Sequence, residues 1–118
     1  MHLLVAEDNE LNYEILSEQL EMHGITCDHA ENGKICVDMF TSAENFCYDA
    51  VLMDMQMPVM DGLQATSAIR NLNKPGAHSI PIIAMTANAF KYFFKYPLGI
   101  EINLKGIFLL SDIQGRVW

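Results

Sequence analysis

The sequence has little cysteine, few basic residues and no long apolar run. Its three cysteines are odd in number and form no C-x-x-C pair, which disfavours a disulfide framework and a zinc site. Seven Lys and Arg against 15 Asp and Glu give a formal net charge of −8, which argues against nucleic acid or an anionic membrane as a direct partner. Without a membrane-spanning run or a secretory leader pattern, we expect a cytoplasmic domain with reduced thiols.

The chain does have the length and apolar content of one folded unit. It has 118 residues, of which 51% are hydrophobic and 19% charged. This composition is typical of a globular domain and not of a disordered segment. The length allows one compact domain with a real core and is too short for two.

Short apolar runs alternate with stretches of helical periodicity. Four runs predict strands, namely HLLVA at 2–6, ITCDHA at 25–30, YDAVLM at 48–53 and IPIIAM at 80–85. Three sets with helical spacing lie between them: Leu11, Ile15, Leu16 and Leu20; Ile35, Cys36, Met39 and Phe40; and Ala65, Ala68, Ile69 and Leu72. Strands that alternate with helices imply right-handed βαβ units, and hence an α/β fold with a doubly wound parallel sheet covered on both faces.

Oxygen-bearing side chains follow three of these strands. Glu7 and Asp8 end the first strand, Asp54 ends the third and Thr86 ends the fourth. The carboxyl ends of parallel strands meet at one edge of the sheet, where doubly wound folds bind ligands. For any one of these acids alone, a structural explanation is sufficient: it could be a solvated strand end or a helix N-cap. Three together would repel one another unless a cation lay between them, and a set of oxygen ligands suits Mg²⁺.

Four longer motifs carry a resemblance to a known family. They are LVAEDNELN at 4–12, ENGK at 31–34, VLMDMQMPVMDGLQA at 51–65 and IPIIAMTANAF at 80–90. With them the chain resembles the receiver domains of response regulators in two-component signalling, and especially the receivers of hybrid histidine kinases. The resemblance implies a flavodoxin-like fold with five parallel strands in the order 2-1-3-4-5. It also implies a phosphorelay partner, either a histidine kinase or a histidine phosphotransfer domain.

The resemblance assigns a role to each matching residue. Asp54 would be the nucleophile that takes a phosphoryl group from phosphohistidine, which suits the known use of carboxylates as covalent nucleophiles. The activity implied is Mg²⁺-dependent self-phosphorylation with slow autodephosphorylation, not turnover of a substrate. The Mg²⁺ ligands implied are Glu7, Asp8, Asp54 and the backbone carbonyl of Gln56. The residues implied for phosphate binding and switching are Thr86, Ala87 and Lys105.

The last part of the chain departs from the family pattern. Residues 1–90 are family-like and hold 13 of the 15 acidic residues, whereas the divergent segment 91–118 holds four of the seven basic residues and six of the eleven aromatics. Pro97 interrupts the expected fourth helix. Lys105 follows Thr86 by 19 residues, with Gly106 where the family usually has Pro. Lys105 is therefore interpreted either as the phosphate-pairing lysine or as a solvated lysine on an edge strand.

The divergent segment leads to an expectation about assembly. We expect one domain over 1–118 whose last helix is at most short. A short last helix would leave part of the apolar side of the first helix uncovered, formed by Leu11, Ile15, Leu16 and Leu20. Uncovered apolar area favours association, so we expect a homo-oligomer formed through the carboxy-terminal third.

Two other functions compete with the phosphoacceptor interpretation. A haloacid-dehalogenase-type phosphatase also uses a strand-end Asp with Mg²⁺, but it needs a second Asp two residues later, where this chain has Gln56. A receiver-like interaction module that works without phosphorylation stays open, because the divergent segment contains the residue expected to pair with phosphate. The four histidines, His2, His23, His29 and His78, have no partner at metal or nucleophile spacing and are expected to be structural or solvent-facing.

Overall fold

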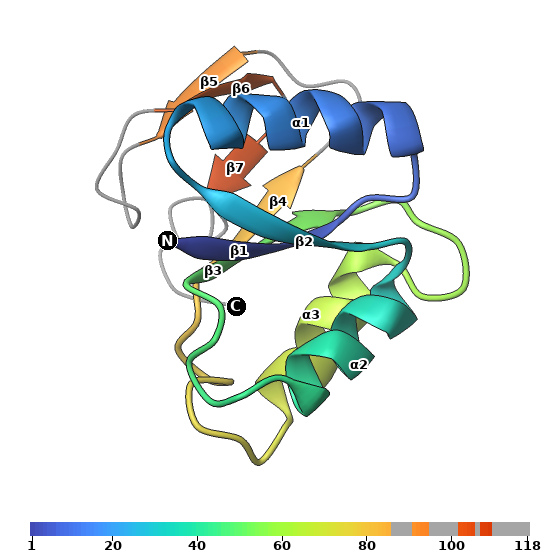
Figure 1. The fold of residues 1–118 in the computed structure, drawn as a ribbon. Helices are drawn as coiled ribbons and strands as arrows, with labels where there is room; N and C mark the ends of the chain where they lie inside the picture. Colours follow the sequence, from blue (N-terminus) through green and yellow to red (C-terminus); the bar gives the residue numbers. More distant parts are fainter. Residues whose placement is uncertain (86–90, 95–101, 106, 110–118) are drawn as a thin grey trace.

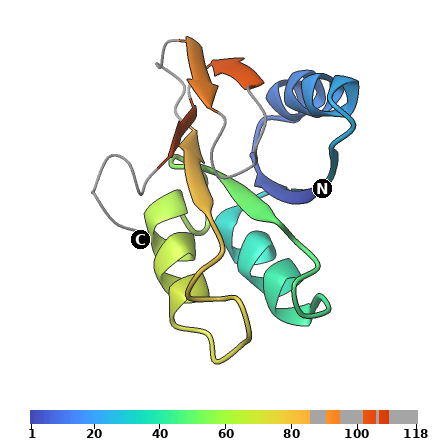
Figure 2. The same cartoon turned by 90° about the vertical axis from the view of Figure 1, so that its left-hand side faces the viewer.

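The computed structural model describes residues 1–85, 91–94, 102–105 and 107–109, and in the last three segments it describes the backbone alone. A central sheet lies between two helical layers (Figure 1). Helix α1 (Glu10–Met22) covers one face, and α2 (Gly33–Ser42) and α3 (Gly62–Arg70) cover the other (Figures 1 and 2). In the described part of the chain, no helix is both long and apolar enough to cross a membrane.

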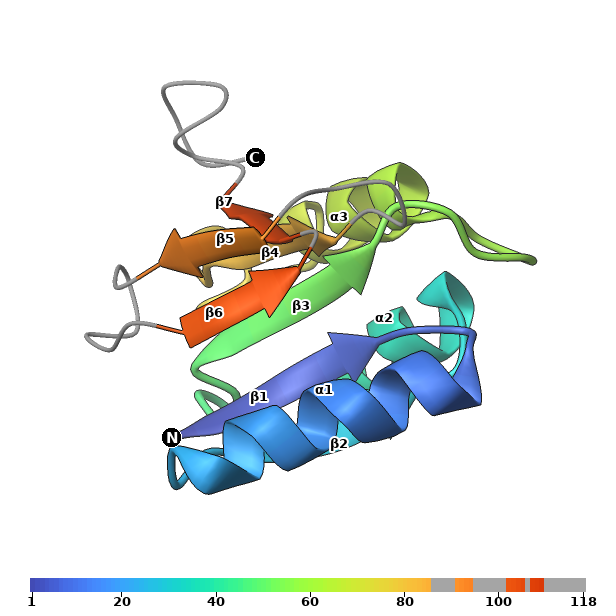
Figure 3. The ribbon, with the colours of Figure 1, turned by 90° about the horizontal axis from the view of Figure 1, so that it is seen from above.

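The main sheet has the strand order β2-β1-β3-β4-β7. Its first four members are β1 (His2–Ala6), β2 (Thr26–Ala30), β3 (Ala50–Asp54) and β4 (Ile82–Met85), and all four run parallel. The doubly wound α/β fold, the order 2-1-3-4 and the three helices between these strands are therefore confirmed. The register pairs Ala6 of β1 with Met53 of β3, so the two strands end side by side (Figure 3).

The fifth strand differs from the predicted one. The edge next to β4 is taken by β7 (Ile107–Leu109), which runs antiparallel. A parallel return needs a crossover connection, usually a helix. Here the chain after β4 instead forms β5 (Lys91–Phe94) and β6 (Ile102–Lys105), an antiparallel pair on the α1 side of the sheet (Figures 1 and 2). The main sheet thus has five strands, as predicted, but the fifth runs antiparallel and not parallel, in the part of the chain that was expected to be atypical.

Two apolar clusters hold the layers together, one on each face of the sheet. Because side chains alternate along a strand, Leu4 of β1 faces α2 and α3, while its neighbour Leu3 faces α1. The α2 and α3 side is packed by Cys36, Phe40, Ala65 and Ile69, and the α1 side is packed by Leu16 and Leu20. Burial of such apolar side chains is the main source of the stability of the layers.

Part of the apolar side expected for the first helix is exposed on α1, namely Leu11 and Ile15. They are 63% and 50% exposed, whereas Leu16 and Leu20 are buried. Tyr13, Leu16 and Leu20 recur at the spacing of one helical face and turn toward the sheet, which places Leu11 and Ile15 on the flank of α1.

Each helix begins at a polar N-cap. The side chains of Asn9, Asn32 and Asp61 accept hydrogen bonds from backbone N–H groups three residues later. At α3 the bond is reciprocal, since the Gln64 side chain accepts from the Asp61 backbone N–H at 3.0 Å. These caps satisfy backbone donors that the first helical turn leaves unpaired. They fix where each helix starts relative to the strand before it.

Candidate functional site

Three carboxylates meet at the carboxyl-terminal edge of the sheet. Glu7 and Asp8 follow β1, and Asp54 is the last residue of β3. One ligand oxygen from each lies within 4.8 Å of the others. Glu7 is buried, Asp54 is partly buried and Asp8 is exposed. The cluster is thus open to solvent on one side and rests on two rigid strands.

Backbone amides orient two of these carboxylates. The Asn9 N–H donates to Oε1 of Glu7 at 3.0 Å, and the Gln56 N–H donates to Oδ1 of Asp54 at 3.0 Å. A carboxylate that accepts from an amide two residues later is held close to its own backbone. Both side chains therefore have a defined orientation.

The loop from β3 to α3 passes very close to Asp54. The Gly62 N–H donates to the Met55 carbonyl at 3.2 Å. A Cβ atom at residue 62 would lie 2.4 Å from the backbone oxygen of Asp54 and 2.8 Å from the Met55 Cα, so only glycine fits there. Within this loop Val59 is 80% exposed and has a φ of 68°, which is a strained conformation for a β-branched residue.

The environment raises the pKa of both inner acids. Burial is the main reason that the pKa of Asp54 rises to about 7, and the negative charges of Glu7 and Asp8 add to it, while the Gln56 N–H acts in the opposite direction. Burial likewise raises the pKa of Glu7. Each group is thus more costly to ionise than in water. A cation among the three would offset that cost.

The donor set fits Mg²⁺. It consists of carboxylate oxygens alone, gathered within the span of one ion's coordination sphere, and Mg²⁺ prefers such oxygen ligands together with water. Because Asp8 is exposed, water would be able to reach an ion bound at the cluster. Zinc prefers His and Cys ligands, and no His or Cys side chain among the described residues belongs to the cluster.

The raised pKa of Asp54 predicts how stability depends on pH. An unfolded Asp54 loses its proton near its ordinary pKa of 3.8, whereas the folded group keeps it up to about pH 7. The folded state binds more protons in this interval, so the free energy of unfolding falls as the pH rises through it. We expect the free energy of unfolding of the native chain to fall by about 1–2 kcal/mol more than that of Asp54→Asn across this pH interval, after allowance for solvent screening. Both proteins are measured in EDTA. Urea unfolding across that range measures the difference, and equal pH profiles for the two proteins would contradict it.

Of the other predicted site residues, only Gln56 is described with its side chain. Gln56 is exposed and lies two residues beyond Asp54. Thr86 and Ala87 lie outside the described residues, but Met85 before them pairs with Asp54 in the register of β3 and β4. Lys105 is the last residue of β6, opposite Lys91 of β5, and its side chain lies outside the description. The roles of these residues stay predictions.

A residue that sequence reasoning did not assign to the site is His29. Its Nε2 atom lies 2.7 Å from the backbone oxygen of Glu7. The two residues are 22 positions apart, so sequence spacing gave no reason to pair them. A parallel register that sets Ala6 beside Ala30 brings His29 to the end of β1.

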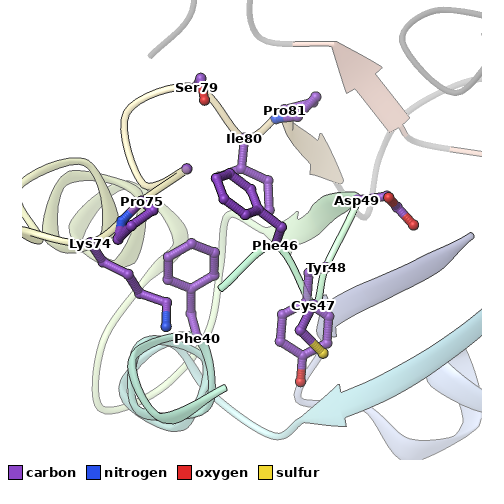
Figure 4. Close-up of a pocket in the computed structure, with 11 residues that line it drawn as sticks. Phe40, Phe46, Cys47, Tyr48, Asp49, Lys74, Pro75, Ser79, Ile80 and Pro81 are labelled. Atoms are coloured by element: carbon purple, nitrogen blue, oxygen red, sulfur yellow. The ribbon is translucent and has the colours of Figure 1, made fainter. Parts of the chain in front are cut away.

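A separate pocket lies at the opposite end of the same strands. Its volume is about 240 Å³, and Phe40, Phe46 and Tyr48 stand around it (Figure 4). Residues that precede β3 and β4 form much of its wall, whereas the acids follow β1 and end β3. The Lys74 Nζ at its rim donates to the Ala43 carbonyl at 2.6 Å, at the end of α2. The pocket is therefore not part of the acid cluster.

The chain is similar in sequence to receiver domains and to hybrid histidine kinases. The family model for the response regulator receiver domain matches residues 3–96. The chain is 42% identical over 91 residues to hybrid signal transduction histidine kinase I of Dictyostelium discoideum, covering 75% of this chain and 5% of that protein. It is 37% identical over 91 residues to the peroxide stress-activated histidine kinase mak1 of Schizosaccharomyces pombe, covering 76% and 6%.

A solved structure shows the same fold. The receiver domain of sensor histidine kinase PA1611 from Pseudomonas aeruginosa PAO1 superposes with a TM-score of 0.66 at 34% identity, covering 74% of this chain and 67% of that one. That crystal structure has a magnesium ion coordinated in its active site cleft. The fold and the acid cluster define a receiver module of two-component signalling. The chain belongs to the response regulator receiver domain family.

Proposed function

We propose that this chain is a phosphoacceptor that receives a phosphoryl group on Asp54. The observation that carries the proposal is the position of Asp54 at the end of β3, with its carboxylate within 4.8 Å of Glu7 and Asp8. If Asp54 served only the stability of the fold, an apolar residue at the end of β3 would serve better, because burying an acid costs free energy. A reactive acid on a rigid strand beside two more acids suits phosphoryl transfer with a divalent cation.

The proposed step is a displacement at phosphorus. A carboxylate oxygen of Asp54 attacks the phosphorus of a phosphohistidine, so a P–O bond forms and the P–N bond breaks. The histidine nitrogen leaves with the electron pair of that bond and takes up a proton. The product is an aspartyl phosphate, and hydrolysis of this acyl phosphate by water returns Asp54 and inorganic phosphate.

The residues proposed to hold Mg²⁺ are Glu7, Asp8, Asp54 and the backbone carbonyl of Gln56. When bound, Mg²⁺ supplies positive charge that offsets the negative charge of the acids and of the incoming phosphoryl group. The Gln56 N–H holds Oδ1 of Asp54 at 3.0 Å, which limits the rotation of the nucleophile. Orientation of this kind lowers the entropy cost of an in-line attack.

Further roles are proposed for residues after β4. Thr86 would donate to a phosphate oxygen, the small Ala87 would leave space for it and Lys105 would pair with its charge. The register supports the first role, since Met85 lies opposite Asp54 and Thr86 follows it directly. Contact of the phosphate with these residues would then alter the segment after β4 and so signal the phosphorylated state.

The proposed donors are a histidine kinase or a histidine phosphotransfer domain. The support is the similarity to hybrid histidine kinases, of which this chain matches 5% and 6% of the length. The matched segment corresponds to the receiver part of such proteins, so the kinase reaction and the output of those relatives are not assigned to this chain. The net charge of −8 is consistent with a protein donor in preference to nucleic acid.

Labelling with acetyl phosphate tests the function directly. We expect the purified chain to incorporate phosphate close to one per molecule with Mg²⁺ present and very little in EDTA. Acetyl phosphate replaces the phosphohistidine donor, with acetate as the leaving group. The label should be lost in alkali or hydroxylamine, as acyl phosphates are. Absence of label under both conditions would contradict the phosphoacceptor function.

Removal of Asp8 should weaken the binding of Mg²⁺. We expect Asp8→Ala to lower the affinity at least about tenfold, because one of three charged ligands is lost while the desolvated Glu7 and Asp54 remain. Isothermal titration with MgCl₂ measures the affinity. Asp38→Ala, which removes an equal charge from an exposed site on α2, is the matched control and should bind Mg²⁺ like the native chain. Equal affinity of Asp8→Ala and the native chain would place the ion elsewhere.

A second function, an interaction module that works without phosphorylation, is supported by the position of β6. This strand pairs with β5 and not with the main sheet, so Lys105 does not lie on the strand beside β4. If the phosphate were not held by Lys105, the switch would be impaired. The labelling experiment separates the two functions, because the interaction module would fail to incorporate phosphate with Mg²⁺ present.

A further inference from the structure

The backbone of Glu7 is held by two hydrogen bonds to the end of β2. Its N–H donates to the Ala30 carbonyl at 3.0 Å, and its carbonyl accepts from Nε2 of His29 at 2.7 Å. Since a carbonyl oxygen only accepts, Nε2 carries the proton in this bond. The first bond continues the pattern of the parallel sheet, but the second comes from a side chain. The imidazole therefore replaces a backbone donor just beyond the end of the strand.

The ring of His29 is itself fixed in place. It stacks on the ring of Tyr13 from α1, with centroids 3.8 Å apart and planes inclined by 7°. Both side chains are half-buried. The Tyr13 hydroxyl lies 3.4 Å from Sγ of Cys27, two residues before His29 on the same strand. The stacking of these two rings thus aims the donor nitrogen of His29 at Glu7.

The bonded carbonyl belongs to the peptide that joins Glu7 to Asp8. A peptide unit is planar, so fixing the direction of its C=O also fixes the direction of the Asp8 N–H and the path into the Asp8 Cα. The next residue, Asn9, donates to Glu7 Oε1 and caps α1. The segment that carries two of the three acids therefore has one defined course.

We propose that His29 is a positioning residue for the acid cluster, acting through the Glu7–Asp8 peptide. Its role is to hold these two carboxylates in the arrangement that binds Mg²⁺, without contact with the ion. The inference rests on the proposed function, since it concerns the same metal site. The bond requires only a hydrogen-bond donor at Nε2.

Three single variants separate the donor from the ring. His29→Phe keeps an aromatic ring for Tyr13 and removes the donor. His29→Gln removes the ring but has an amide nitrogen the same number of bonds from Cα as Nε2 of histidine, so it restores a donor. Tyr13→Phe keeps the ring stack and removes only the hydroxyl group near Cys27, and it serves as the matched control.

Magnesium affinity is measured for each variant by isothermal titration calorimetry. We expect His29→Phe to weaken Mg²⁺ binding about tenfold, as is typical when a partner of a metal ligand is removed, and Tyr13→Phe to leave it unchanged. His29→Gln should lie within about threefold of the native chain. Native affinity in His29→Phe would overturn the proposal, and so would a loss of affinity in Tyr13→Phe equal to that in His29→Phe.

A second measurement keeps this inference separate from the metal site itself. In the Mg²⁺-free chain, the Asp8 amide proton resonance should shift upfield in His29→Phe and stay near its native position in His29→Gln, because that amide shares a peptide with the bonded carbonyl. If the native chain bound no Mg²⁺, the metal part of the proposed function would fail and His29 would have no site to position. If His29→Phe and His29→Gln lost stability and Mg²⁺ affinity equally, the role of His29 would be purely structural and the proposal would be wrong.

Discussion

Asp54→Asn is expected to abolish phosphorylation of this chain while leaving its fold intact. The amide has nearly the size of the carboxylate but lacks the anionic oxygen that attacks phosphorus, so labelling by acetyl phosphate in Mg²⁺ should fall at least about 10³-fold. The fold should persist because the variant relieves the repulsion with Glu7 and Asp8 and keeps an oxygen able to accept from the Gln56 N–H. Incorporated phosphate after gel filtration gives the rate and the stoichiometry.

The matched control for this variant is Asp38→Asn. It makes the same chemical change at an exposed acid that pairs with Lys34 on α2. We expect this control to be labelled at the native rate. Undiminished labelling of Asp54→Asn, or a label that resists alkali, would show that another residue is the acceptor.

Gly62→Ala is expected to have a large effect on stability. Its new methyl group would lie 2.4 Å from the Asp54 backbone oxygen and 2.8 Å from the Met55 Cα, and neither backbone atom can move without shifting β3. We expect a loss of about 3 kcal/mol in the free energy of unfolding, as is typical of severe overpacking. Because the clash falls on Asp54 itself, the labelling rate of the folded fraction should fall as well.

Gly24→Ala is the comparison that isolates the steric clash. Gly24 has a φ of 73°, but a Cβ atom there would meet nothing within 4 Å. The free energy of unfolding should fall by only about 1 kcal/mol, because alanine disfavours the left-handed backbone conformation. The labelling rate should not change. Urea unfolding of both variants measures the contrast. Equal losses would mean that the contact with Asp54 relaxes easily and that Gly62 serves only the turn.

The sheet and the acid cluster were predictable because each depends on a pattern that is local in sequence. Alternating strands and helices require parallel pairing, and parallel pairing brings the residues after β1 and β3 to one edge. Glu7, Asp8 and Asp54 lie together for that reason. The N-caps at Asn9, Asn32 and Asp61 likewise depend on residues three positions apart.

Features that depend on contacts between distant residues were not predictable. The apolar residues of α1 span more than one face, and only the position of the sheet shows that Leu16 is buried and Ile15 is not. The antiparallel direction of β7 depends on the path of the chain after β4, where periodicity is weak. The bond from His29 to Glu7 needs the register of β1 with β2, which composition and spacing do not supply.

The position of the acids in the strand order has a consequence for how the protein is made. Glu7, Asp8 and Asp54 come from β1 and β3, which are neighbours in the sheet, and β4 completes the burial of β3 by residue 85. Synthesis proceeds from the amino terminus, and domains fold as units as they emerge from the ribosome. All the elements that bring the three acids together are therefore present before residues 86–118 have been added. A nascent chain arrested after residue 85 would already contain every carboxylate of the cluster, together with His29.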